Sequence, residues 1–300
     1  MILTERPVTD NLFPGFRLLD VQTSGTRIRV RVGGEGPPLL LLHGYPQTHV
    51  MWRRVAPRLA QRFTLICPDL RGYGDSEKPP SDAEHAPYSK RAMARDMAEV
   101  MTALGHEHFL VGSHDRGARV AHRLALDHGE RVLKLATLDI APTREMYRDT
   151  TDAFARGYWH WFFLIQPAPM PERMIESDPE FYWTSRRASD MRLFEPEALA
   201  EYLRCFRDPA MIHASCEDYR AAATIDIAHD DADGSRKLAM PLLALWGERG
   251  IIGKCFDPLA LWRERAQDVR GRALPGGHYL AEEVPDLVAA EFEAFFGEAA

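Results

Sequence analysis

Short apolar runs alternate with helical patterns along most of the 300-residue chain. Continuous hydrophobic runs bounded by glycine, proline or aspartate predict buried strands at residues 39–42, 63–67, 109–111, 133–140, 242–246 and 269–274. Strands that are apolar on both faces and alternate with helices are typical of a parallel sheet covered by helices on each side. The pattern therefore predicts an α/β fold with a mostly parallel sheet.

The strand signal stops between Ile140 and Met240. This stretch is rich in Trp, Tyr, Phe, Met and Pro, and its apolar residues have helical spacing around 158–165 and 197–206. We therefore predict a helical cap inserted into the α/β core. The expected organisation is a first part of the core over 1–142, the cap over 143–237 and a second part of the core over 238–300, without internal repeats.

The composition is that of an ordinary globular protein, with 45% hydrophobic residues and a formal net charge of −7. No long basic run is present, which argues against a nucleic-acid surface. The first residues lack the layout of a signal peptide and no apolar run reaches membrane-spanning length, so we expect a cytoplasmic protein without a membrane partner. The cysteines are scattered, which predicts reduced thiols rather than a metal site, at Cys67, Cys205, Cys216 and Cys255.

Residues 111–119, Val-Gly-Ser-His-Asp-Arg-Gly-Ala-Arg, resemble the nucleophile elbow of a hydrolase, with aspartate where most such hydrolases have serine. An elbow is a tight turn from a strand into a helix, and small residues must flank it. Ser113 and Gly117 lie two residues on either side of Asp115, after an apolar strand and before a helical pattern. The competing frame, with Ser113 as nucleophile, puts Val111 and Asp115 at the small positions and fits poorly.

A carboxylate nucleophile needs no base before it attacks a saturated carbon, and it leaves an ester on the enzyme. A base is then required to hydrolyse that ester. Elbow hydrolases carry nucleophile, acid and histidine in that chain order. His278 follows the last predicted strand in the glycine-rich segment Leu-Pro-Gly-Gly-His-Tyr, and among twelve histidines it alone combines these features. We predict His278 as general base; the alternative is a histidine of a surface loop.

An imidazole base needs a carboxylate that holds its tautomer and stabilises its cation. Asp139 ends a predicted strand, at the carboxyl edge where α/β sheets place functional groups. Glu248 follows Leu-Trp-Gly in the other usual region for the acid. We favour Asp139, whose alternative role is to cap the turn into the next residues.

An oxyanion hole is expected from backbone N–H groups on two sides of the elbow. The segment Leu-His-Gly-Tyr-Pro at 42–46 follows an early strand and offers the amide of Tyr45, and the elbow itself offers the amide of Arg116. The side chain of His43 is expected only to brace this loop.

Arg116 and Arg119 fall in the first turn of the predicted helix, where cations oppose the helix dipole and need a compensating anion. A substrate that carries its own carboxylate is repelled by Asp115, and two guanidinium groups offset that repulsion while they orient the anion. The alternative is that both arginines pair with acidic residues of the protein.

Three cap residues, His160, Trp161 and Tyr219, carry donor groups that can meet a departing halide, although cap aromatics are more often simple packing. His106 and His108 form a pair without further ligands at metal-site spacing, so a metal site is not expected there. The mechanism requires no metal and no cofactor.

The motifs together resemble the haloacetate dehalogenases, in particular the fluoroacetate dehalogenases, of the α/β-hydrolase superfamily. The resemblance covers nearly the whole chain and rests on the segments at 43–52, 69–76, 114–119, 158–161, 166–169 and 276–278. Related epoxide hydrolases and haloalkane dehalogenases share the elbow but usually have tryptophan directly after the nucleophile. This chain has Arg116 there.

The resemblance implies an α/β-hydrolase fold, attack by Asp115 on the halogen-bearing carbon, and a homodimer. It implies that Arg116 and Arg119 bind the substrate carboxylate and that Asp139 is the partner of His278. It also implies a halide cradle formed by His160, Trp161 and Tyr219. One departure is Tyr45, where close relatives have phenylalanine, and this hydroxyl leaves the preferred halide and substrate size open.

These features predict hydrolysis of a short 2-haloacid, such as fluoroacetate or chloroacetate, to the 2-hydroxyacid and halide. An epoxide hydrolase with the same nucleophile and base is the main rival. It would need two hydroxyl donors, Tyr219 and one further tyrosine among Tyr147, Tyr158, Tyr182 and Tyr202. A non-catalytic ligand receptor on this fold has no need for a complete set of nucleophile, acid and base.

Overall fold

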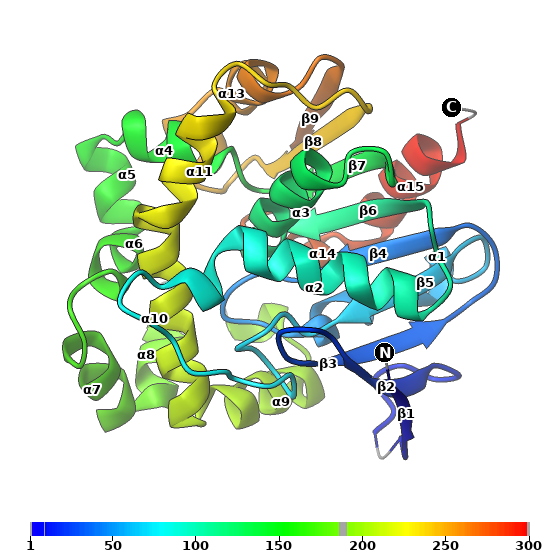
Figure 1. The fold of residues 1–300 in the computed structure, drawn as a ribbon, viewed down its shortest axis with the longest axis horizontal. Coiled ribbons are helices and arrows are strands. Elements are labelled where there is room, and N and C mark those ends of the chain that lie inside the picture. The colour runs from blue at the N-terminus through cyan, green and yellow to red at the C-terminus, as the bar shows by residue number, and fades with distance from the viewer. Residues whose placement is uncertain (1, 9, 186–190, 299–300) are drawn as a thin grey trace.

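The computed structural model describes residues 2–8, 10–185 and 191–298 (Figure 1). In these residues nine strands form one sheet in the order β1-β2-β3-β5-β4-β6-β7-β8-β9. The pairings among β1, β2, β3 and β5 are antiparallel, and every pairing from β5 through β4 to β9 is parallel. The predicted α/β fold with a mostly parallel sheet is confirmed.

The strands span β1 Leu3–Arg6, β2 Arg17–Gln22, β3 Arg27–Gly33, β4 Pro38–Leu42, β5 Thr64–Pro68, β6 Phe109–His114, β7 Val132–Leu138, β8 Leu242–Gly247 and β9 Val269–Leu274. The six strands expected from continuous apolar runs correspond to β4–β9. The first three strands were not predicted, because charged residues interrupt their apolar residues. In β3, Ile28, Val30 and Val32 are buried and alternate with arginines, which is typical of antiparallel strands at the side of a sheet.

Helices cover both faces of the sheet. Helices α2 and α3 lie together on one face, whereas α15 packs on the other, where the ring of Phe292 lies against Gly112 of β6. The helices of the core span α1 Ala56–Leu59, α2 Lys90–Ala103, α3 Arg116–Asp127, α12 Ile252–Cys255, α13 Pro258–Arg265, α14 Leu280–Glu283 and α15 Pro285–Gly297. Two short 3-10 helices accompany them, η1 His49–Trp52 and η2 Ala86–Tyr88.

Between β7 and β8 the described residues form helices and no strand. These elements are α4 Thr143–Arg148, α5 Asp152–Gly157, α6 Trp159–Leu164, α7 Met170–Ser177, α8 Pro179–Ser185, η3 Met191–Leu193, α9 Pro196–Phe206, α10 Pro209–Ala223 and α11 Ile225–Asp233. Figure 1 shows most of them, in green and yellow, gathered along one side of the sheet. They occupy the stretch predicted as a cap, although its residues 186–190 lie outside the described part of the chain.

Buried apolar side chains fill the space between the sheet and its helices, and strands β4 and β6 are almost entirely inaccessible. Burial of such runs on both faces is the main stabilising contribution to this core. The four cysteines are free thiols. No helix in the described residues is long and apolar enough to cross a membrane.

Candidate active site

Asp115 lies on the turn between β6 and α3. Its backbone has a φ of 47°, a left-handed conformation that non-glycine residues rarely adopt. Strain of this kind persists where the surrounding structure enforces it, and it lifts the side chain out of the end of the strand. Ser113 instead lies within β6, and its buried hydroxyl donates to the carbonyl of Ala136 at 2.8 Å. The geometry therefore favours the frame with Asp115 at the turn.

The turn is possible because two glycines permit close approach. A Cβ atom on Gly117 would lie 2.4 Å from the carbonyl oxygen of His43, and one on Gly44 would lie 2.5 Å from the Cβ of Asp115. Both distances are far below ordinary van der Waals contact, so α3 and the 43–46 loop can meet only without these side chains. The small residue expected at 117 thus has a direct steric reason.

The backbone N–H of Tyr45 donates to Oδ1 of Asp115 at 3.0 Å. Arg116, whose amide is the second predicted donor, directly follows Asp115 and is the first residue of α3. The side chain of His43 does brace this loop, since its Nε2 accepts from the backbone N–H of Leu70 at 3.0 Å. One carboxylate oxygen is therefore held by a backbone donor, which leaves Oδ2 as the oxygen available for chemistry.

His278 faces Asp115 with one ring nitrogen and Asp139 with the other. Its Nδ1 lies 2.6 Å from Oδ2 of Asp139, and its Nε2 lies 4.0 Å from Oδ2 of Asp115. Asp139 is fully buried and is fixed by the N–H of Gly247, which donates to its Oδ1 at 2.9 Å. Glu248 is exposed. Of the two candidate acids, Asp139 is the one in contact with His278.

Asp115 is buried, yet its surroundings keep it ionised. Burial by itself raises the pKa of a carboxyl group, but the neighbouring His278 and Arg116 and the N–H of Tyr45 outweigh that effect, so the pKa of Asp115 is lowered. A carboxylate in this state is a nucleophile without prior proton transfer.

Arg116 is buried and paired with a carboxylate of helix α10. Its Nη2 lies 2.6 Å from Oδ1 of Asp218 on α10, and its Nε lies 2.9 Å from Oδ2. Lys90 and Tyr73 bind the same carboxylate, and Nη1 of Arg116 has no partner in the described residues. For Arg116 the structure therefore shows the alternative stated above, pairing with an acidic residue of the protein, while its Nη1 has no hydrogen-bond partner in this part of the chain.

Arg119 is buried and, within the described residues, has no carboxylate partner. Its Nη2 lies 3.4 Å from the sulfur of Met146, and its Nε and Nη1 have no hydrogen-bond partner there. Burial, followed by repulsion from Arg116, lowers the pKa of Arg119 to about 10. An unpaired buried cation is costly, and a bound anion relieves that cost.

Aromatic rings lie against both guanidinium groups. The central carbon of Arg116 lies 4.0 Å from the ring centre of Tyr219, and that of Arg119 lies 4.4 Å from the ring centre of Trp161. The indole N–H of Trp161 is buried without a hydrogen-bond partner in the described residues. His160 lies 6.0 Å, ring centre to ring centre, from Tyr219. The three residues expected to cradle a halide are therefore close together beside the arginines.

A cavity of about 680 Å³ opens at this site. Asp115, His278, Tyr45, His160 and Tyr158 line it, whereas the two arginines, Trp161 and Tyr219 are buried outside its lining. Asp115 and His278 are therefore reached from the cavity, whereas the two guanidinium groups lie deeper in the protein.

Sequence reasoning missed two residues of the site. Tyr158 was considered only as an epoxide donor, yet its hydroxyl lies 3.0 Å from Nδ1 of His278. Asp218, the partner of Arg116, was not identified at all. No sequence pattern around Asp218 indicates that it pairs with Arg116, because this contact depends on how α10 packs against α3.

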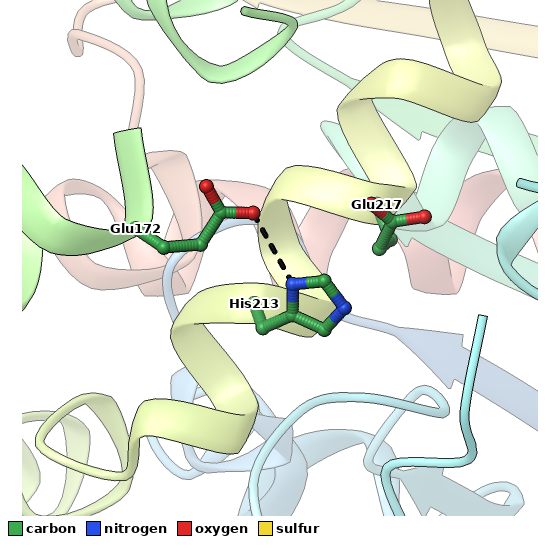
Figure 2. Close-up of side chains that lie close together, drawn as sticks. All are labelled: Glu172, His213 and Glu217. Atoms are coloured by element: carbon green, nitrogen blue, oxygen red, sulfur yellow. Dashed lines mark hydrogen bonds and ion pairs between the residues drawn. The ribbon is translucent and has the colours of Figure 1, made fainter. Parts of the chain in front are cut away.

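One group of side chains in the described residues has the composition of a metal site, Glu172, His213 and Glu217 (Figure 2). Nδ1 of His213 lies 3.2 Å from Glu172. The guanidinium of Arg220, however, lies 2.6 Å from both Glu172 and Glu217. Both carboxylates thus already share one cation, and the cluster does not line the cavity at Asp115. His106 and His108 belong to no such group in this part of the chain.

Comparison with known proteins adds a family to this geometry. A family model described as the alpha/beta hydrolase fold matches residues 37–283. The chain is similar to a fluoroacetate dehalogenase from Burkholderia sp., at 46% identity over 295 residues and 96% of each chain. It is also similar to a soluble epoxide hydrolase from Corynebacterium sp. strain C12, at 35% identity over 88% of this chain and 92% of that relative.

Among solved structures, the chain is similar to a protein from Nostoc sp. PCC 7120 that is provisionally assigned to the alpha/beta hydrolases. The two share 56% identity with a TM-score of 0.93, over 95% of this chain and 99% of that one.

Proposed function

Because this chain belongs to the fluoroacetate dehalogenase family of the alpha/beta hydrolases, we propose that it hydrolyses a short 2-haloacid to the 2-hydroxyacid and halide. Fluoroacetate and chloroacetate are the substrates proposed. The catalytic residues proposed are Asp115, His278 and Asp139.

The observation that carries the proposal is the unpaired guanidinium of Arg119 on the helix that begins at the nucleophile. Together with Nη1 of Arg116 it offers several N–H donors in a buried, positively charged position. A haloacid supplies the missing carboxylate, and its halogen-bearing carbon is only one bond away from that anion. A neutral substrate brings no negative charge to compensate the buried guanidinium.

In the first proposed step, Oδ2 of Asp115 attacks the halogen-bearing carbon from the side opposite the halide. The C–O bond forms as the carbon–halogen bond breaks, and the halide leaves with the bonding electron pair. His160, Trp161 and Tyr219 are proposed to receive it through N–H and O–H donors. The buried, unpartnered indole N–H of Trp161 supports this role.

In the second step, water attacks the side-chain carbonyl carbon of the ester. Nε2 of His278 takes the proton of that water, and Asp139 stabilises the imidazolium through Nδ1. The N–H of Tyr45, which contacts Oδ1 at 3.0 Å, and the amide of Arg116 are proposed to stabilise the oxyanion. When the tetrahedral state collapses, the bond between the side-chain carbon and the ester oxygen breaks, and the departing alkoxide takes the proton from the imidazolium to give the 2-hydroxyacid. The carboxyl group of Asp115, which now holds the oxygen of the water, then releases its proton to solvent.

The test is the His278→Asn variant incubated with chloroacetate, followed by intact-protein mass spectrometry and peptide mapping. The expected result is an ester that accumulates on Asp115, with one halide released per protein. His108→Asn, which changes an exposed histidine, is the matched control and should turn over without accumulating ester. An unmodified Asp115 in the His278 variant, with the wild type active, would reject the two-step scheme.

Epoxide hydrolysis is the second candidate, because two tyrosines belong to the site. The hydroxyl of Tyr158 lies 3.0 Å from Nδ1 of His278, and the ring of Tyr219 lies 5.3 Å, centre to centre, from that of Tyr45, whose N–H contacts Asp115. Tyr202 is a poor donor for this purpose, since its hydroxyl is bound to Glu282 at 2.6 Å. Halide release from fluoro-, chloro- and 2-chloropropionate, measured beside diol formation from styrene oxide, distinguishes the two. Diol formation without halide release would favour the epoxide hydrolase.

Three further features remain proposals. We propose that 143–237 acts as a cap domain on a core formed by 1–142 and 238–300. We also propose a homodimer, and the exposed Met174 and Phe181 on the cap offer apolar surface for it. Sedimentation equilibrium tests the dimer, and a single monomeric species at micromolar concentration would reject it. A cytoplasmic location stays a prediction, to be tested by cell fractionation.

A further inference from the structure

The side chain of Tyr158 connects the helices between β7 and β8 with His278, the proposed general base. It lies at the junction of α5 and α6, where its own N–H donates to Phe154 and its carbonyl accepts from Trp161. Its side chain is buried, lines the cavity and contacts the ring of His278 edge-on at 5.8 Å between ring centres. Hydrogen bonds fix the backbone of Tyr158, and packing against His278 fixes its ring.

Nδ1 of His278 has two oxygen neighbours, Oδ2 of Asp139 at 2.6 Å and the hydroxyl of Tyr158 at 3.0 Å. An ionised carboxylate can only accept, so the short contact with Asp139 requires the ring proton on Nδ1. Burial, followed by the nearby Asp139 and Asp115, raises the pKa of Tyr158 well above its ordinary value, so the phenol stays neutral. Its oxygen is then a second acceptor for the same N–H group.

Two acceptors at one nitrogen have a definite consequence. They favour the tautomer with the proton on Nδ1, and they limit rotation of the ring. Nε2 is then left with a lone pair directed toward Asp115, 4.0 Å away, where the hydrolytic water must be deprotonated. The second oxygen also stabilises the imidazolium that forms in this step.

We propose that Tyr158 is a positioning residue that sets the tautomer and orientation of His278 for ester hydrolysis, and that it makes this step depend on the seating of the α5–α6 segment. The inference rests on the proposed function. It concerns the second step alone, because attack by Asp115 does not use His278 as a base.

Other titratable or charged groups near His278 are unchanged in the test. Those that approach its ring are Asp139 after β7, Asp115 at the elbow, His114 at the end of β6 and the adjacent Tyr279. Three more line the same cavity, Arg249, Glu282 and Glu283.

The test is Tyr158→Phe, with the two steps measured separately under single-turnover conditions with chloroacetate. Halide release reports alkylation, and loss of the ester mass reports hydrolysis. Removal of one hydrogen-bonding oxygen should slow hydrolysis roughly 2- to 10-fold and leave alkylation within about twofold. The acidic limb of the hydrolysis pH profile should move to lower pH, because the imidazolium loses an acceptor.

Tyr88→Phe is the control, since it removes a buried phenol that donates to the carbonyl of Pro79 at 2.7 Å, outside the cavity lining. It should change neither step. Equal slowing of both steps in Tyr158→Phe, without movement of the pH profile, would show that Tyr158 acts only through packing and would overturn the proposal. A hydrolysis rate and pH dependence in Tyr158→Phe equal to those of the wild type would also overturn it.

A readout without substrate separates this inference from the proposed function. The downfield ¹H signal of the His278 Nδ1–H in the free protein should shift in Tyr158→Phe and not in Tyr88→Phe. If the wild type released no halide, the proposed function would fail, and this signal alone would decide the role of Tyr158. An unchanged His278 signal in Tyr158→Phe would overturn the proposed positioning role of Tyr158.

Discussion

Replacement of Arg119 by methionine should weaken catalysis and, at the same time, stabilise the free protein. The lowered pKa of Arg119, about 10 instead of about 12.5, means that the folded state disfavours the charged guanidinium. At neutral pH the arginine is charged in both folded and unfolded states, so the folded state is penalised by about 3 kcal/mol. Loss of the cation–π contact between Arg119 and Trp161 should lower the free energy of unfolding by about 1 kcal/mol.

The expected net gain is therefore about 1–2 kcal/mol in the free energy of unfolding, or roughly 2–4 °C in Tm. Loss of a charged clamp on the substrate carboxylate should cost about 3 kcal/mol, on the order of 100-fold in kcat/KM. Urea titration and halide-release kinetics measure the two effects.

Arg123 provides the matched control on the same helix. It is equally buried but pairs with Asp230 at 2.6 Å and with Asp233. Arg123→Met should therefore destabilise the protein, by about 3–5 kcal/mol, because it strands buried acids. The reasoning is refuted if Arg119→Met is less stable than the wild type, or if its kcat/KM stays within threefold of the wild-type value.

Two more predictions follow from the same geometry. Asp139→Asn should slow ester hydrolysis by roughly 10³–10⁴-fold, by analogy with loss of the acid in other triads, whereas Glu248→Gln, which changes an exposed residue, should have no effect. Ester decay is followed by mass spectrometry, and slower decay in Glu248→Gln than in Asp139→Asn would contradict the assignment. Because the pKa of Asp115 is lowered, the nucleophile stays ionised and the halide burst should be constant from about pH 5 to about pH 8; a burst rate that falls toward the acidic end would count against an ionised Asp115.

Much of the architecture could be read from short-range patterns. The runs that became β4 and β6 are buried on both faces, so their place inside a parallel sheet follows from the continuous apolar sequence, whereas β9 at the edge is only partly buried. The elbow was also recognisable, since the small residues around Asp115 have a local steric cause, which Gly117 illustrates. Strands β1–β3 were not predicted, because none of them has a long continuous apolar run: β1 is exposed, β2 is interrupted by Asp20, and β3 alternates apolar residues with arginines.

The partners of the site residues were decided by tertiary packing. Asp139 and His278 are 139 positions apart, and only the meeting of β7 with the loop after β9 selects Asp139 over Glu248. Arg116 and Asp218 are separated by 102 positions, and nothing in the elbow segment indicates that one arginine is neutralised while Arg119 is not.

The sequence by itself therefore determined the strand and helix periodicities and which side chain lies at the elbow, the proposed nucleophile, because steric repeat and residue type act within a few positions. The tertiary structure decided which charges are paired and which oxygens reach His278. Those outcomes depend on distances of a few ångströms between segments remote in the chain, and electrostatic and hydrogen-bond energies change steeply over such distances.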